Sequence, residues 1–468
     1  MASANPIAIM SQSSSGLLGS VLKAFGLRIS ATKSRVLHDG IWVIGGQVAA
    51  AAGTLIGVRL LTELVAPPIF GAVSLLMGIT LLGTNLFCTP FLQAATRFFP
   101  EMAREGNVRQ LRCLIGDFLR VTTLVLVGSV LVGGCIYSRV RSSSIIVFIP
   151  LAALIVVDVV RNLEVNLLSA ARRQGACALW QGAEAWARPA LAAGAVLTFG
   201  ATVQSILAGY LGASILTLAL FFSCVRREGS DVLRQETALD SRLSKQIAHY
   251  AFPLVPLAIV GWISSLSDRY VIGGMLGLEQ VGIYAASVGL ISRPFIMIGT
   301  VLLNTLRPVY FEAVSGEKRA VAQKTLRIWL GCGSLFFALG ILAIASLSRP
   351  IANWLLAEQY RSSAALMPYL AFGYSLICLS QVFSTVSLAY KRSWCVLISE
   401  SSAAATSLFV GIPLTYWFGL KGAAGAVPIY GAVQLGTAWW LARRTRAAAE
   451  TTSGSESRSI REAPAQCN

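Results

Sequence analysis

Charged side chains are scarce in this chain. Only 13% of its 468 residues are Asp, Glu, Lys or Arg, about half the share of a soluble globular protein, and only two are histidines. The sequence also has no Gly-x-x-x-x-Gly-Lys-Ser/Thr loop, no Gly-x-Ser-x-Gly element and no Asp-x-Asp pair. The scarcity of charge argues against a water-soluble domain. The missing motifs leave the chain without a nucleotide site of its own and disfavour an enzyme.

Apolar residues are abundant instead. Hydrophobic residues make up 55% of the chain, and the mean hydropathy is +0.68. A bilayer core about 30 Å thick is crossed by about 20 apolar residues in a helix. The sequence therefore predicts an all-α polytopic membrane protein with about twelve transmembrane helices, at residues 40–61, 70–94, 114–136, 145–170, 177–199, 203–225, 250–275, 281–303, 325–347, 364–389, 394–418 and 422–442.

The basic residues set the predicted orientation. The net charge is +17, and the Lys and Arg residues lie between the apolar segments, so membrane topology explains them better than nucleic-acid binding does. With the N-terminus in the cytoplasm, the cytoplasmic segments hold 27 basic residues and the outer loops 5. The first 35 residues lack the apolar core of a cleaved signal peptide. We therefore expect a multi-pass membrane protein with both termini cytoplasmic.

Cysteine usage indicates neither a disulfide framework nor a metal site. The nine cysteines include no pair with metal-ligand spacing, and none falls in a predicted outer loop. We expect them to be lipid-facing or helix-packing thiols, and we predict no cofactor and no metal.

The second half of the chain repeats the first. Arg59 matches Arg269 and Arg97 matches Arg307 at a separation of 210, and Phe70-Gly71 matches Val281-Gly282 at 211. Several matches at nearly one offset predict two six-helix lobes, related by an axis along the membrane normal, with a substrate cleft between them. The predicted organisation is a cytoplasmic tail (1–36), an N-terminal lobe (37–225), a linker (226–248), a C-terminal lobe (249–446) and a second cytoplasmic tail (447–468).

The fourth predicted helix carries a polar stripe. At 100° per residue, its polar side chains fall within an arc of about 140°, opposite an apolar side. Such a stripe is typical of a helix that faces a polar lumen, although an interhelical hydrogen-bond seam would give the same pattern. The stripe comprises Asp158, Arg161, Asn162, Asn166 and Ser169.

Other ionisable residues within the spans are candidates for function, because a charge at mid-membrane is costly unless it faces protein or water. Glu184 and Arg188 are spaced for an intrahelical pair, which either neutralises itself or meets a ligand. Arg293 has no acid near it in sequence, which favours contact with an anion. The candidates for proton or cation coupling are Asp158, Glu184, Asp268 and Glu400, each of which could instead pair with a neighbouring helix.

Soft motifs of Gly, Pro and charge follow several of the spans. The sequence has Pro68-Ile-Phe-Gly71 after the first helix, Ala95-Thr-Arg97-Phe-Phe-Pro100-Glu101 after the second, and Ser267-Asp268-Arg269-Tyr270 in the seventh. Over residues 36–446 the chain resembles the polysaccharide-transporter and O-antigen flippase branch of the multidrug/oligosaccharidyl-lipid/polysaccharide (MOP) exporter superfamily, which also contains the multidrug and toxin extrusion (MATE) transporters.

The resemblance implies a function in glycan export. It implies that the chain moves an undecaprenyl-diphosphate-linked oligosaccharide to the outer leaflet of the bacterial inner (plasma) membrane for O-antigen, capsule or exopolysaccharide synthesis. The partners it implies are membrane lipids, a polymerase and a chain-length regulator of the same pathway. Arg161, Arg188 and Arg293 would neutralise the diphosphate, since guanidinium groups bind phosphate through two parallel hydrogen bonds. The sugar contacts would come from Asn162, Asn166 and Gln181.

Three other functions remain open at this point. A MATE-type drug/cation antiporter would need an anionic cleft, whereas the arginines within the spans equal the acids in number. A membrane glycosyltransferase or polymerase would need larger outer loops and the missing motifs. The third alternative is a non-transporting scaffold of a polysaccharide assembly complex.

Overall fold

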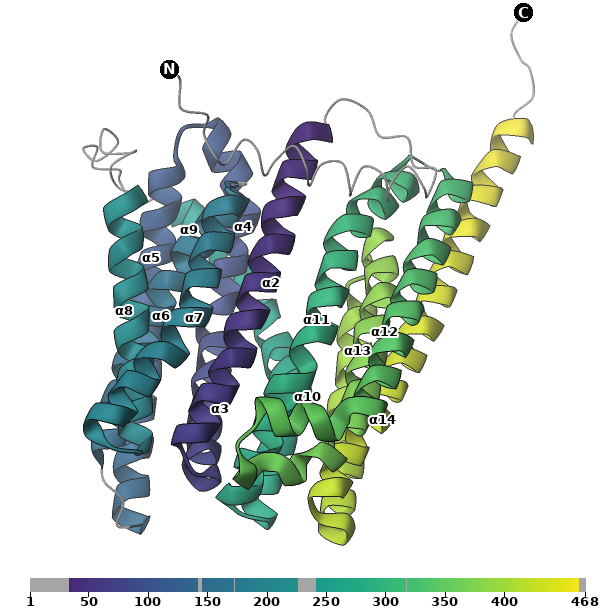
Figure 1. Ribbon diagram of the computed structural model, residues 1–468. Helices are drawn as coiled ribbons and strands as arrows, with labels where there is room; N and C mark the ends of the chain where they lie inside the picture. Colours follow the sequence, from purple (N-terminus) through teal and green to yellow (C-terminus); the bar gives the residue numbers. More distant parts are fainter. Residues whose placement is uncertain (1–32, 142–144, 172, 226–240, 317, 463–468) are drawn as a thin grey trace, which may run out of the picture.

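The computed structural model describes residues 33–141, 145–171, 173–225, 241–316 and 318–462, and this part of the chain is helical with no β-strand. Figure 1 shows the helices running nearly parallel to one another. Their bounds are α2 (Lys33–Leu64), α3 (Pro67–Phe87), α4 (Thr89–Arg104), α5 (Val108–Arg141), η1 (Ile145–Val147), α6 (Phe148–Ala170), α7 (Gln174–Phe199), α8 (Val203–Val225), α9 (Ser241–Ala251), η4 (Phe252–Leu254), α10 (Val255–Met275), α11 (Leu278–Ser315), α12 (Arg319–Leu355), η5 (Glu358–Ala365), α13 (Met367–Ala389) and α14 (Trp394–Glu462).

These helices provide the twelve predicted crossings. Nine helical stretches of the described chain are long and apolar enough to cross a membrane. One of them, α14, is two spans in succession, because Gly419 breaks its helical geometry with φ 59° and ψ −139°. The helices α6 and α7 are not among these nine stretches. Both carry charged side chains, but their 23 and 26 residues suffice for a core of about 30 Å.

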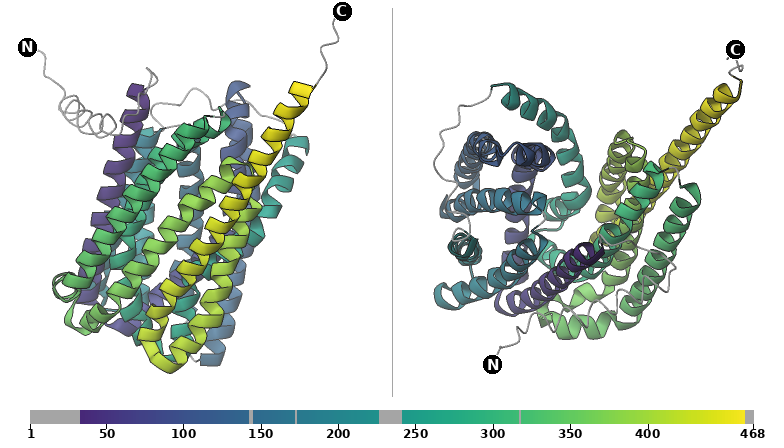
Figure 2. Two further views of the ribbon diagram at one scale, coloured as in Figure 1. Left: turned by 90° about the vertical axis from the view of Figure 1, so that its right-hand side faces the viewer. Right: turned by 90° about the horizontal axis from the view of Figure 1, so that it is seen from above.

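The helices form two lobes, which are seen side by side from above in Figure 2. In the N-terminal lobe, α7 packs on α2 and α8, and α6 packs on α5 and α8. In the C-terminal lobe, α13 packs on α14 and α11, and α10 packs on α14. Two parallel six-helix lobes agree with the internal repeat in the sequence.

Small residues bring α2 and α7 into close contact. A Cβ on Gly53 would lie 3.0 Å from the carbonyl oxygen of Ala185, and one on Gly57 would lie 2.6 Å from the Cβ of Pro189. Trp186 donates a hydrogen bond of 3.0 Å to the carbonyl oxygen of Ala49. Close backbone approach at small residues replaces the hydrophobic driving force that is absent between helices in lipid.

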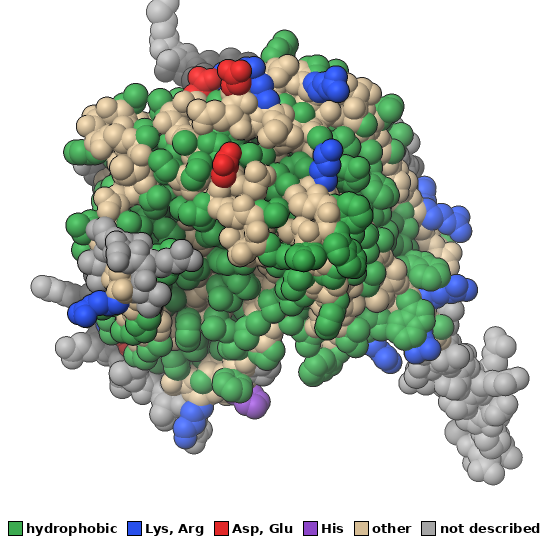
Figure 3. Space-filling model, turned by 90° about the horizontal axis from the view of Figure 1, so that it is seen from below, with side chains coloured by type: hydrophobic (Ala, Val, Ile, Leu, Met, Phe, Trp, Pro, Cys, Tyr) green, Lys and Arg blue, Asp and Glu red, His purple; other side chains and the backbone are tan. Residues whose placement is uncertain are grey.

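The two lobes contact each other at the end where α3 and α11 begin. There the hydroxyl of Tyr360 donates to the carbonyl oxygen of Val65 (2.8 Å), and the hydroxyl of Tyr270 donates to that of Leu75 (2.8 Å). Trp262 adds a hydrogen bond of 2.9 Å to the carbonyl oxygen of Gly78. Figure 3 shows this end of the molecule, where hydrophobic side chains dominate and charged ones are few.

The described residues cover only part of the predicted tails and linker. The N-terminal tail lies outside the described residues up to position 32, as do positions 226–240 of the linker. The rest of the linker belongs to α9, whose Leu243 and Ile247 are buried in the core of the N-terminal lobe. Beyond position 446, α14 continues to Glu462. Seven cysteines whose side chains the structure describes are free thiols, of which Cys88 and Cys177 are buried and Cys113 and Cys135 are exposed.

Candidate functional site

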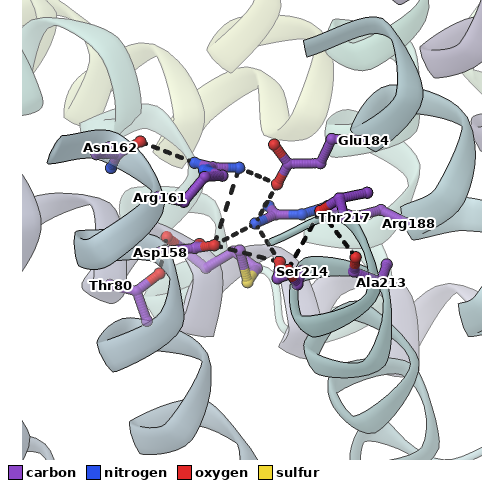
Figure 4. Close-up of polar contacts among 10 residues, drawn as sticks. Thr80, Asp158, Arg161, Asn162, Glu184, Arg188, Ala213, Ser214 and Thr217 are labelled. Atoms are coloured by element: carbon purple, nitrogen blue, oxygen red, sulfur yellow. Dashed lines mark hydrogen bonds and ion pairs between the residues drawn. The ribbon is translucent and has the colours of Figure 1, made fainter. Parts of the chain in front are cut away.

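A network of four ionisable side chains lies inside the N-terminal lobe (Figure 4). Arg188 of α7 is 2.6 Å from Asp158 of α6 and 2.8 Å from Glu184 on its own helix. Arg161 of α6 pairs with Glu184 and is 3.9 Å from Asp158. The four side chains are 10–21% exposed. Each arginine therefore contacts both carboxylates, and the charges balance within the network.

Neutral polar groups complete the network. Arg188 donates to the hydroxyl of Ser214 on α8 (3.0 Å), and this hydroxyl donates to Asp158 (3.3 Å). Arg161 donates to the side-chain oxygen of Asn162 (2.9 Å). The Nε atom of Arg188 is buried and has no hydrogen-bond partner within the described part of the chain. The network thus joins α6, α7 and α8, and the Nε–H of Arg188 is a hydrogen-bond donor that the network does not use.

The polar stripe of α6 has the predicted orientation in part. Asp158, Arg161 and Asn162 line a cavity of about 290 Å³. On the opposite side of the helix, Val159 and Leu163 are buried against the core of the N-terminal lobe. The same side chains therefore form an interhelical seam and line a cavity.

This cavity lies between the lobes. The N-terminal lobe contributes α3, α6 and α7 to its wall, including Arg188, and the C-terminal lobe contributes Leu266 and Arg269 of α10. Arg269 donates a 3.0 Å hydrogen bond across the interface to Ser74 of α3, and its Nε atom is buried without a partner in the described chain. Three arginines from two lobes therefore meet at one cavity.

The C-terminal lobe holds a second set of polar groups beside Arg269. Asp268 accepts a hydrogen bond of 2.5 Å from the hydroxyl of Tyr284 and one of 2.7 Å from the backbone N–H of Arg269. Arg293 is exposed on α11, within electrostatic reach of Arg269 and Tyr374. Among the described residues, no carboxylate forms an ion pair with Arg293.

A larger cavity, of about 390 Å³, lies within the C-terminal lobe. Glu400 of α14 lines it together with Tyr374, Tyr430 and Gln434, and Gln434 hydrogen-bonds Glu400. Among the described residues, no Lys or Arg lines this cavity. Within that part of the chain, Glu400 is therefore an acid that faces a cavity without a basic partner, unlike Asp158 and Glu184.

The structure brings some of the predicted site residues together and leaves others apart. Arg161, Arg188, Asn162, Asp158 and Glu184 form one cluster, whereas Arg293 and Asp268 lie in the other lobe. Asn166 donates to the backbone of Asn162 (2.7 Å), and Gln181 is exposed on α7.

Carboxylates from a neighbouring helix pair with Arg161 and Arg188, the two arginines of this cluster that the sequence predicts to meet an anion. Ser74 and Ser214 have no counterpart among the predicted site residues, because isolated serines in apolar helices give no signal in sequence.

This fold and its interface cavity define a polytopic membrane protein with the architecture of the MOP superfamily of transporters. Residues 36–314 match the family described as polysaccharide biosynthesis protein. The match covers more than half of the chain, and the chain belongs to this family. No curated protein matches the chain.

Solved structures of MOP proteins share the fold. An inward-facing multidrug resistance MATE transporter is 14% identical with a TM-score of 0.65, over 91% of this chain and 97% of that one. The lipid II flippase MurJ, in an inward closed conformation, is 12% identical with a TM-score of 0.64, over 86% of this chain and 87% of that one. A MOP transporter from Pyrococcus furiosus, noted for the reverse polarity of its binding pocket, is 13% identical with a TM-score of 0.62, over 89% and 97%.

Proposed function

We propose that the chain is a flippase that moves an undecaprenyl-diphosphate-linked oligosaccharide from the inner to the outer leaflet, for O-antigen, capsule or exopolysaccharide synthesis. Membership of the polysaccharide biosynthesis family supports the class of cargo. The observation that carries the proposal is the cavity between the lobes, where Arg161 and Arg188 face Arg269. Guanidinium groups recognise phosphate oxygens through paired hydrogen bonds.

The paired state of the arginines suggests how cargo and ions are exchanged. A diphosphate that enters the cavity competes with Asp158 and Glu184 for Arg161 and Arg188. Each carboxylate that loses its arginine then needs a proton or a cation, because an uncompensated charge at this depth is costly. Anion binding and ion uptake are thereby coupled within one network. The sugars would contact Asn162, Asn166 and Gln181.

The C-terminal lobe provides the other half of the proposed mechanism. Arg269 attracts the diphosphate from the opposite wall of the cavity. Arg293 of the same lobe adds a positive charge outside the cavity lining, and Asp268 and Glu400 are candidates for the coupling ion. The membrane potential adds about 2.3 kcal/mol per charge per 100 mV for an anion that moves outwards. With both termini cytoplasmic, the lobe contacts at the start of α3 and α11 close the outer end, and transport requires the lobes to rock apart there.

A flipping assay tests this function. The purified full chain in proteoliposomes should move a lipid-linked oligosaccharide between leaflets. We expect Arg293→Ala to lower the initial rate about tenfold or more, since a hydrogen bond to a charged group contributes about 1.5–3 kcal/mol. The matched control is Arg349→Ala, which removes an exposed arginine near the far end of α12. Unaltered flipping in Arg161→Ala, Arg188→Ala and Arg293→Ala alike would reject an arginine-lined substrate site.

One observation favours a second candidate, a drug/cation antiporter. Glu400 faces the cavity within the C-terminal lobe, and none of the described residues in the wall of that cavity is basic. Such an acid suits a cationic substrate. Proteoliposomes that accumulate an organic cation against a proton gradient, and that leave the lipid-linked oligosaccharide in place, would select the antiporter.

A further inference from the structure

A groove on the surface of the C-terminal lobe lies apart from both cavities described above. It has a volume of about 500 Å³ and is bounded by α12, α13 and the last part of α14. In Figures 1 and 2, α12 and α14 lie on the side of this lobe that faces away from the N-terminal lobe. The groove is at the end of the molecule where α12 begins, which is the predicted cytoplasmic end. It therefore opens towards lipid at the level of the inner leaflet.

One face of α14 provides the basic wall of this groove. Trp439, Arg443 and Arg446 follow one another at spacings of four and three, which places them on one side of the helix. The guanidinium of Arg443 lies 5.6 Å from the centre of the Trp439 ring. Arg446 hydrogen-bonds Tyr310 of α11, and its buried Nε atom has no partner in the described chain.

These arginines have no counter-charge among the residues that the structure describes. Within the described part of the chain, no carboxylate forms an ion pair with Arg443 or Arg446. The remaining wall is apolar, with Leu330 of α12 and Phe383 of α13. Both side chains lie deeper along their helices, away from the helix ends that carry the basic residues. The groove is thus basic near the membrane surface and apolar towards the membrane interior.

We propose that this groove binds an anionic phospholipid of the inner leaflet, with its phosphate between Arg443 and Arg446 and an acyl chain along Leu330 and Phe383. Basic pockets between helices at the cytoplasmic side of a membrane suit anionic head groups. The proposal does not depend on the transport function, because the groove faces away from the cleft between the lobes.

Arg444 provides a matched control. Its guanidinium lies 3.9 Å from the centre of the Trp440 ring, so it has the same charge, depth and aromatic partner type as Arg443, but it does not line the groove. Arginine and tryptophan are also common anchors at membrane interfaces. If these residues act only as anchors, substitution of Arg443 and of Arg444 should lower the lipid affinity equally.

Native mass spectrometry of the purified full chain, titrated with phosphatidylglycerol or with phosphatidylcholine of the same acyl composition, tests the proposal. We expect selective retention of phosphatidylglycerol, an affinity about fivefold lower in Arg443→Ala (about 1 kcal/mol), and no change in Arg444→Ala. Arg443→Lys should keep most of the affinity. Ala447→Trp, which retains every charge but fills the mouth of the groove, should lower it without changing the thermal unfolding temperature.

Three results would overturn the proposal. Equal binding of the two phospholipids would remove the role of charge. Equal losses of phosphatidylglycerol affinity in Arg443→Ala and Arg444→Ala would show that the lipid is attracted by the basic surface in general and not bound in the groove. Displacement of phosphatidylglycerol by an equal concentration of undecaprenyl phosphate would assign the groove to the carrier lipid instead.

Discussion

Gly71 and Gly282, which are 211 positions apart, lie against each other where the two lobes meet. A Cβ on Gly71 would lie 2.8 Å from the amide nitrogen of Gly282 and 2.1 Å from the carbonyl oxygen of Leu278. A Cβ on Gly282 would lie 2.0 Å from the carbonyl oxygen of Pro67. The two glycines occupy matching positions of the sequence repeat, so a glycine in each half permits the close approach at the interface.

We predict that Gly282→Ala opens this end of the molecule. The added methyl group meets backbone rather than a flexible side chain, so the lobes must separate to admit it. The measurement is the labelling of Ser74→Cys by a membrane-impermeant maleimide, added outside spheroplasts, in a background without native cysteines. Labelling should increase several-fold.

Gly274→Ala is the control for that experiment, because a Cβ on this α10 glycine has no atom within 4 Å. If both substitutions leave Ser74→Cys equally protected, the contact between Gly71 and Gly282 does not seal the interface.

A covalent link between the lobes should stop transport. Thr62 and Ala357 face each other across the interface, since the backbone nitrogen of Ala357 is 3.4 Å from the hydroxyl of Thr62. We expect oxidation of a Thr62→Cys/Ala357→Cys pair to abolish flipping, and dithiothreitol to restore it, because rocking requires these residues to part. A pair within one lobe, Ser402→Cys/Thr437→Cys (hydroxyls 3.0 Å apart), should flip normally when oxidised. Full activity of the linked lobes would refute the rocking motion.

The membrane crossings could be predicted because each is a local run of apolar residues. The two lobes could be predicted because residues of the two halves match at a nearly constant separation. An apolar run of about 20 residues is stable as a helix across the bilayer. The apolar runs also predicted α6 and α7, although both helices carry charged side chains. The repeat aligned Gly71 with Gly282, but it gave no information that the two residues touch.

The ion pairs within the candidate site could be predicted from the sequence only in part. Glu184 and Arg188 share a helix, and their spacing predicted the observed contact. The pairs of Arg161 with Glu184 and of Arg188 with Asp158 depend on how α7 is rotated against α6. Such a rotation depends on tertiary packing, including the close approach of Gly53 and Gly57 of α2 to α7, which no local sequence pattern records. The same holds for the contact of Arg269 with Ser74.

The buried network should make a measurable contribution to stability. Arg161→Ala leaves Glu184 with one partner in place of two, and loss of a partner from a buried pair typically costs about 3–5 kcal/mol. We expect unfolding of the purified protein by denaturant to show a loss of about 3 kcal/mol. The control is Arg120→Ala, because Arg120 pairs with Asp117 at 3.1 Å but is 81% exposed, and such pairs contribute about 0–1 kcal/mol.

A double variant separates charge from packing in this network. Replacement of Glu184 by glutamine in the Arg161→Ala background removes the unmatched carboxylate, so part of the lost stability should return. Further loss in the double variant would show that Arg161 contributes through packing rather than through charge.

Glu400→Gln should uncouple transport from the ion gradient. Glutamine keeps the size of the side chain and its hydrogen bond to Gln434, but it can neither bind nor release a proton at this position. We expect flipping in proteoliposomes to continue at a basal rate and to lose its acceleration by an imposed proton or sodium gradient. Glu358→Gln, which neutralises an exposed acid of η5, should leave the acceleration intact. If gradient-driven flipping survives in Glu400→Gln, the coupling site lies instead at Asp268 or at Asp158 and Glu184 of the arginine network. Asp158 and Glu184 are paired with arginines, so an incoming anion would have to displace them before they could bind an ion.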